Sequence, residues 1–136
     1  MAMNYSWNWG VLLQPTGVGN EVYWQWLLTG FKWLLVIGGS GWLIALIIGT
    51  ILGIMRTLPN KTARAIGTAY VSFFRNIPLL IQLFFWFYVA PTWLTPALQK
   101  WWFQELDPNT SAVISASLGL GLFTAARIAE QVRTGI

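Results

Sequence analysis

The sequence contains no cysteine and no histidine, and only four of its 136 residues are Asp or Glu. Without Cys there is no disulfide, thiolate nucleophile or Cys-based metal site, and without His there is no imidazole chemistry. Catalysis would depend on four carboxylates that no spacing brings together as a pair. These absences argue against an enzyme and against a cofactor held by this chain.

Charge is also scarce: 9% of the residues are charged and 56% are hydrophobic, whereas soluble domains carry about 25% charged residues. The composition therefore predicts an integral membrane protein. The ten Trp residues agree with this class, because indole rings favour the boundary between headgroups and hydrocarbon.

The net charge of +4 does not indicate a nucleic-acid-binding protein, because the eight Lys and Arg are dispersed beside apolar runs. They are better interpreted as topology signals. The sequence also lacks the Gly-x-x-x-x-Gly-Lys-Ser/Thr pattern of a P-loop, so energy for any pumping would have to come from another protein.

The strongest predicted membrane span covers residues 31–56. Between Lys32 and Arg56 lie 23 uncharged residues, which as a helix reach roughly 34 Å, enough for a hydrocarbon core of about 30 Å. The segment that follows, up to Arg64, is basic without any acid, so it is predicted to be cytoplasmic. Residues 1–30 then form a loosely ordered external segment, and they lack the basic region of a secretory signal.

A second span is predicted over residues 71–91, after a cytoplasmic loop and interfacial helix at 57–70. The uncharged stretch after Arg75 is too short to cross alone, so this side chain is expected to snorkel toward the headgroups. Pro78 lies inside the span and predicts a kink or a local break there.

Residues 92–109 are predicted to form an external loop with a short amphipathic helix, in which Thr95 is the N-cap and Pro96 the first helical residue. The third span is predicted at residues 110–133 and returns to the cytoplasmic side. The fold class is therefore all-α and membrane-embedded, with three transmembrane helices.

Small residues recur at helical spacing on two of these spans and are typical of close helix packing in membranes. They would contact either the other spans of this chain, or further helices and a partner subunit. The positions are Gly41, Ala45, Gly49 and Gly53 on the first span, and Ser115, Gly119 and Gly121 on the third.

A few polar residues inside or beside the spans are candidates for a substrate path. Arg127 and Glu130 are three positions apart and can pair on one helical face, although Arg127 could instead anchor the helix at the inner interface. Gln82 could line a path or form hydrogen bonds between helices. The complete set of path candidates is Arg127, Glu130, Gln82, Arg75 and Asn76.

Two stretches of this sequence resemble one family. Residues 70–87, YVSFFRNIPLLIQLFFWF, and residues 120–136, LGLFTAARIAEQVRTGI, resemble the permease subunits of bacterial polar amino-acid ABC importers. Shorter supporting matches lie at 6–10, 56–60 and 105–109, and together they resemble the glutamate/aspartate branch.

The resemblance implies a type I ABC importer permease fold with five spans, in the bacterial inner membrane, with its N-terminus in the periplasm. It implies a sister permease as hetero- or homodimer partner, a cytoplasmic ATPase dimer that holds ATP and Mg, and a periplasmic solute-binding protein; lipid surrounds the spans. The family's coupling helix would lie beyond Ile136, so the chain is expected to be a truncated, N-terminal portion.

Within such a family, an Arg at position 127 would suit a dicarboxylic substrate, because a guanidinium donates two parallel hydrogen bonds to a carboxylate. The sequence thus gives the hypothesis that Arg127, oriented by Glu130, is a specificity element. The alternatives are a permease of the same family for another polar amino acid, or a channel or scaffold subunit outside it.

Overall fold

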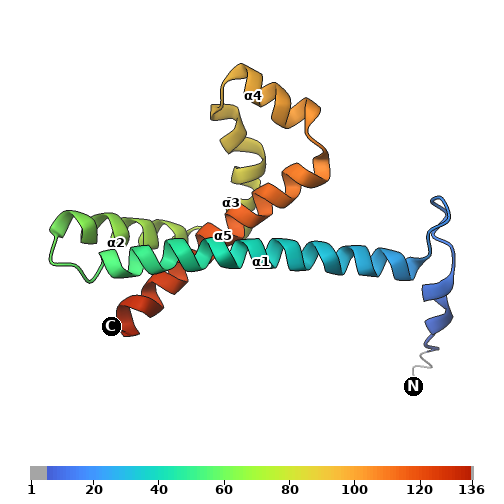
Figure 1. Cartoon of the computed structure of the whole chain (residues 1–136), viewed down its shortest axis with the longest axis horizontal. Coiled ribbons are helices and arrows are strands. Elements are labelled where there is room, and N and C mark those ends of the chain that lie inside the picture. Colours follow the sequence, from blue (N-terminus) through green and yellow to red (C-terminus); the bar gives the residue numbers. More distant parts are fainter. Residues whose placement is uncertain (1–5, 136) are drawn as a thin grey trace, which may run out of the picture. The chain divides into compact units, whose positions relative to one another are not determined.

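A computed structural model describes residues 6–135, and every regular element in that part of the chain is helical. The chain divides into two compact units, Met1–Leu35 and Val36–Ile136. Figure 1 shows the order of the elements along the chain.

The first unit contains a short 3-10 helix, η1 (Trp9–Leu13), followed by a closed turn. Pro15 and Val22 form an isolated antiparallel bridge across this turn. Gly17 and Gly19 have positive φ angles of 79° and 60°, a conformation that favours glycine. The segment before the first long helix therefore has local order, which composition alone does not predict.

Helix α1 (Tyr23–Met55) begins eight residues before the predicted start of the first span at residue 31. Lys32 lies within this helix, and its ammonium nitrogen is 5.6 Å from the ring centroid of Trp33. At 33 residues the helix is about 50 Å long, more than a hydrocarbon core of about 30 Å requires.

Helix α2 (Lys61–Asn76) begins at an N-cap formed by Asn60. The side-chain oxygen of Asn60 accepts hydrogen bonds from the backbone N–H groups of Thr62 and Ala63, at 2.9 and 3.4 Å. Two of the unpaired N–H groups at this helix end are satisfied in this way.

We expect Asn60→Ala to raise the amide exchange rates of Thr62 and Ala63 roughly fivefold, because the loss of an N-cap costs about 1 kcal/mol. Hydrogen exchange of the full chain in lipid nanodiscs would measure this. Asn60→Asp keeps the acceptor oxygen and is the matched control. Equal exchange in the two variants would contradict the capping role.

The helix predicted for the second span is broken. α2 ends at Asn76 and Ile77 is extended. After Pro78 the chain continues through α3 (Leu79–Phe84), the π-helical η2 (Phe85–Val89) and the 3-10 helix η3 (Ala90–Trp93). At this break, helix α2 and the helical stretch Leu79–Trp93 are bent by 102° relative to one another. Among the described residues, α1 and α5 are each long and apolar enough to span a membrane, and a third span exists only if the bent pair is one crossing.

The remaining connection consists of α4 (Pro96–Lys100) and the π-helical η4 (Trp101–Glu105). Thr95 is the N-cap of α4 and Pro96 its first residue. Helix α5 (Pro108–Gly135) then starts two residues before the predicted position. Its start is fixed by Asp107, whose carboxylate accepts a hydrogen bond from the N–H of Thr110 at 3.2 Å.

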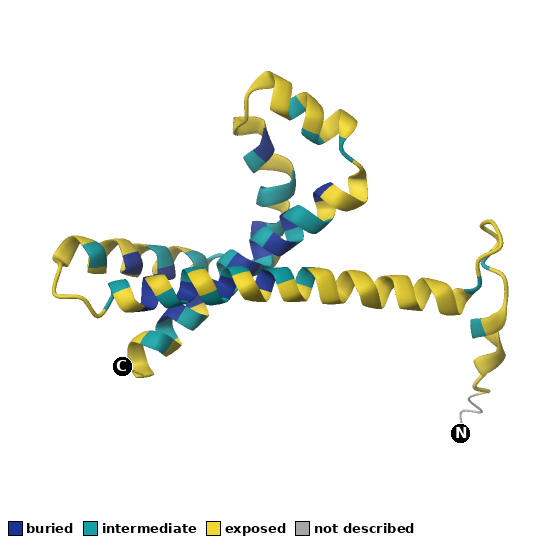
Figure 2. Cartoon of the chain, viewed as in Figure 1, coloured by how far each residue is buried: buried dark blue, intermediate teal, exposed yellow. Residues whose placement is uncertain are grey.

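The core of the second unit lies where α5 meets α2 and the part of α1 after residue 35. Figure 2 shows the buried positions concentrated along these segments. The residues there are small: a Cβ on Gly49 would lie 2.7 Å from Ile128 Cβ, and one on Gly53 would lie 2.6 Å from Val132 Cβ. Ser40 and Ser117 hydroxyls add a 2.7 Å hydrogen bond between the helices. Close backbone approach, rather than burial of large side chains, joins these helices.

Candidate functional site

The carboxylate of Glu130 on α5 is the centre of the charged cluster in the second unit. One oxygen accepts a short hydrogen bond from Arg56, which directly follows α1, and lies 3.8 Å from an Arg75 nitrogen on α2. The other oxygen accepts from Arg133 at 2.6 Å. One acid therefore ties together the ends of three helices.

The three arginines differ in their exposure. The side chain of Arg56 is 11% exposed, whereas those of Arg75 and Arg133 are 54% and 43% exposed. The Arg56 Nε has no partner within residues 6–135. Arg56 is the least exposed of the three arginines, so it depends more than Arg75 and Arg133 on the counter-charge of Glu130.

The predicted pair between Arg127 and Glu130 does not form. Among the described residues the ion-pair partners of Glu130 are Arg56, Arg75 and Arg133, and the Arg127 guanidinium lies 5.0 Å from the ring centroid of Phe123. The residue spacing along α5 could not show that Arg56, which follows α1, would approach Glu130. The orienting contact of Arg127 is therefore a cation–π contact with Phe123.

A cleft of about 520 Å³ opens at this cluster, between α2 and α5. Its lining residues are Arg75, Phe123, Arg127, Glu130 and Gln131. A second cleft of about 310 Å³ shares Arg75 and Glu130 and is also lined by Arg56, Val71, Ser72 and Asn76. The Glu130 carboxylate is already hydrogen-bonded to Arg56 and Arg133. The guanidinium groups of Arg75 and Arg127 therefore keep donors for an anion, and a carboxylate suits their planar geometry.

Gln82 lies on α3, away from both charged clefts. It is 4% exposed, and its amide nitrogen donates to the carbonyl oxygens of Phe74 and Ile77. It lines an apolar cleft of about 340 Å³ with aromatic residues of α2, η2 and η3. The structure therefore groups Arg75, Asn76, Arg127 and Glu130 around the clefts and leaves Gln82 apart.

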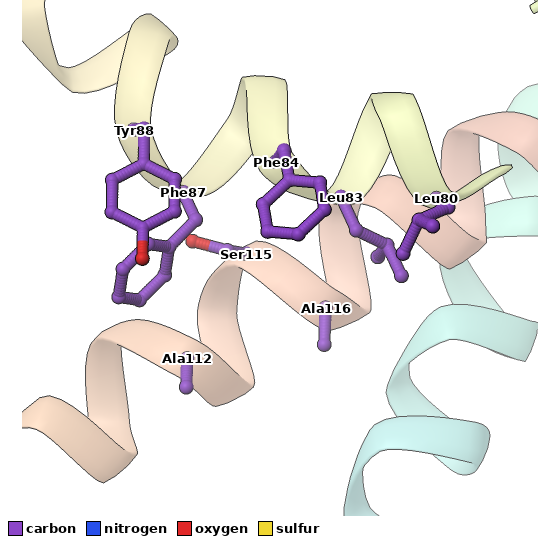
Figure 3. Close-up of a pocket in the computed structure, with 8 residues that line it drawn as sticks. All are labelled: Leu80, Leu83, Phe84, Phe87, Tyr88, Ala112, Ser115 and Ala116. Atoms are coloured by element: carbon purple, nitrogen blue, oxygen red, sulfur yellow. The ribbon is translucent and has the colours of Figure 1, made fainter. Parts of the chain in front are cut away.

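The packing position Ser115 borders a further apolar cleft of about 290 Å³, shown in Figure 3. Leucine and aromatic side chains of α3 and η2 face the small residues of α5 across it. The Ser115 hydroxyl donates to the Trp86 carbonyl at 3.4 Å, and a Cβ on Gly119 would lie 2.8 Å from a Leu83 methyl group. This cleft has no charged group for chemistry.

Sequence reasoning missed Arg56 as a site residue and treated it only as a topology signal. One signal was present: Arg56 follows Gly53 by three positions, so it continues the small-residue face of α1 that meets α5. It also missed Tyr70, whose hydroxyl donates to the Leu122 carbonyl of α5 at 2.8 Å. No cluster of Asp and Glu residues suited to a metal ion occurs within residues 6–135.

The apolar helices and the arginine-lined cleft define a helical membrane protein with a site suited to anions. Comparison with known proteins finds homologues that are permease subunits of amino-acid ABC transporters. Permease subunits of this kind are not enzymes themselves, because the ATPase is a separate subunit.

The chain is 44% identical over 134 residues to the glutamate/aspartate import permease protein GltJ of Escherichia coli (strain K12), covering 98% of this chain and 54% of that protein. It is 32% identical to the glutamate/aspartate import permease protein GltK of Escherichia coli O157:H7, over 81% of this chain and 47% of that protein. It is also 32% identical to the arginine transport system permease protein ArgU of Corynebacterium glutamicum, over 69% of this chain and 30% of that protein.

The chain thus spans about half the length, or less, of these curated relatives. No family model and no solved structure matches it.

Proposed function

We propose that this chain supplies the three-span, N-terminal part of a permease subunit in an ATP-driven importer of acidic amino acids. The observation that carries the proposal is its 44% identity, over nearly the whole chain, to a glutamate/aspartate import permease. The arginine-lined cleft between α2 and α5 supports the same substrate class, because two guanidinium groups there have donors for a carboxylate.

In this proposal the bent pair α2–α3 forms one crossing of the inner membrane, and the N-terminus faces the periplasm. The basic segment from Arg56 to Arg64 supports this orientation through the positive-inside rule. A sister permease, a periplasmic solute-binding protein and a cytoplasmic ATPase dimer with its ATP and Mg complete the importer. Similarity to both GltJ and GltK supports a pair of related permeases.

Arg127 is the proposed specificity element. Its guanidinium lies over the Phe123 ring and borders the cleft without an ion pair to Glu130. A substrate carboxylate can therefore bind it without displacing an internal acid, while Glu130 keeps the neighbouring helices together. The Arg75 side chain is half exposed, and its 3.8 Å distance from a Glu130 oxygen is longer than a hydrogen bond. It can therefore turn toward the same anion.

The test is a chimeric GltJ in which the matched segment is replaced by this chain, expressed in an Escherichia coli strain that lacks GltJ. We expect the chimera to restore glutamate uptake. Absence of uptake, despite normal amounts of chimera in the membrane and normal association with the ATPase, would contradict the proposed substrate class.

In this chimera, we expect Arg127→Gln to lower glutamate uptake roughly tenfold or more, the loss expected when a charge-assisted bidentate contact is removed. Arg64→Gln, an exposed basic residue on α2 outside the clefts, is the matched control and should leave uptake unchanged. Unaltered selectivity for glutamate over glutamine in Arg127→Gln would exclude the specificity role.

A permease for another polar amino acid is the second candidate, because an arginine transport permease is also among the relatives. Competition of labelled glutamate uptake by aspartate, glutamine and arginine separates the two. Inhibition by arginine alone would favour this second candidate.

A further inference from the structure

The break between α2 and α3 leaves backbone carbonyl groups without their usual partners. In a continuous helix the Phe74 carbonyl would accept from the N–H of residue 78, but Pro78 has none. The extended conformation of Ile77 also removes its own carbonyl from the helical ladder. The Gln82 amide nitrogen lies 3.1 Å from the Phe74 oxygen and 3.0 Å from the Ile77 oxygen, so it replaces both lost donors.

Gln82 acts at the bend only as a hydrogen-bond donor. Its side-chain oxygen is buried and has no partner within residues 6–135, while the nitrogen forms both bonds. The segment is apolar enough to belong to a membrane crossing, where water cannot replace a missing donor. Burial of the Gln82 amide costs free energy, and its two hydrogen bonds at the bend offset that cost.

The two carbonyl groups bound by Gln82 belong to Phe74 and Ile77, and the residues between them are Arg75 and Asn76. These two residues line the charged clefts at Glu130. We propose that Gln82 is a positioning residue: its amide fixes the bend at Pro78 and thereby holds Arg75 beside Glu130 and Asn76 in the cleft that both line. The effect on transport rests on the proposed function, whereas the effect on the bend does not.

The chain offers a matched control in Gln99. Its amide nitrogen donates to the Thr92 and Leu94 carbonyls, at 2.7 and 2.8 Å, across the turn before Pro96. The chemistry is the same, but these hydrogen bonds are exposed rather than part-buried. Water or headgroups can replace that donor, so Gln99→Leu should have little effect.

The bend is tested by distance measurements between spin labels on the full chain in lipid nanodiscs. Because the sequence has no Cys, Ala65→Cys on α2 and Val89→Cys on η2 give two unique label sites. The 102° bend predicts a separation of roughly 22 Å, whereas a continuous helix would give about 36 Å. We expect Gln82→Leu to broaden the distribution toward the longer distance, with a roughly tenfold rise in the straightened population.

Pro78→Ala restores a backbone donor, so the double variant Pro78→Ala/Gln82→Leu should give one narrow peak near the longer distance. Gln99→Leu should match the unaltered chain. A Gln82→Leu distribution that coincides with the unaltered chain would overturn the proposal. Equal broadening by Gln99→Leu would overturn it too, because the effect would then not be specific to this bend.

Uptake by the chimeric permease separates positioning from a purely structural role. We expect Gln82→Leu to lower both thermal stability and uptake, and the double variant to regain stability but not uptake, because its helix is straight. Restored uptake in the double variant would overturn the positioning role. If the unaltered chimera imports no glutamate while the distances behave as expected, the proposed function fails and the control of the bend by Gln82 stands.

Discussion

Glu130→Gln is expected to lower the free energy of unfolding of the chain by about 2 kcal/mol, less than the loss of a partner from a fully buried ion pair, because the Arg56–Glu130 pair is part-buried. The neutral amide leaves the guanidinium of Arg56 without a counter-charge, and only 11% of that side chain reaches the surface. Titration with a denaturing detergent, followed by the fluorescence of the ten Trp residues, would measure the loss.

Arg133→Gln is the matched control for this prediction. Arg133 binds the same carboxylate, but its side chain is 43% exposed, so its loss should cost less than about 1 kcal/mol. Arg56→Leu combined with Glu130→Leu should cost less than the sum of the single changes, because no buried charge then remains unpaired. Equal losses for Glu130→Gln and Arg133→Gln would show that burial of Arg56 does not govern the cluster.

Gly49→Ala is expected to destabilise the contact between α1 and α5 by about 1 to 3 kcal/mol. The added Cβ would lie 2.7 Å from Ile128 Cβ and 2.8 Å from the Ala125 carbonyl oxygen. Both atoms are close to or part of the α5 backbone, so the helices would have to separate. Gly53→Ala should behave in the same way, because its Cβ would meet Val132 Cβ and the Ala129 carbonyl.

Gly38→Ala controls for the change in helix propensity, because a Cβ there has no neighbour within 4 Å. Its stability in the same titration should be unchanged or slightly raised, since Ala favours a helix over Gly. If Gly49→Ala and Gly38→Ala have the same stability, close approach at Gly49 does not limit the packing of these helices.

Much of the chain was predictable from local patterns. Uncharged runs between Lys32 and Arg56 and after Asp107 indicated the two long apolar helices, because the length of an apolar run sets whether a helix can cross a bilayer. The prediction of a permease of amino-acid ABC importers, made from two motifs, is confirmed by the relatives. The sequence predicted three crossings, whereas the structure has two long apolar helices and one bent pair among the described residues. Pro78 indicated a disturbance there but not its angle.

The sequence by itself determined the membrane class and the likeness to amino-acid permeases, because composition, run length and motif are all local properties. Only the tertiary structure decided which arginines Glu130 binds, since Arg56 lies 74 positions away along the chain and competes with the local Arg127. It also decided that the chain bends by 102° and that Gln82 supplies the donor there. Pairing and bend angle depend on how distant backbones meet, and no helical period encodes that.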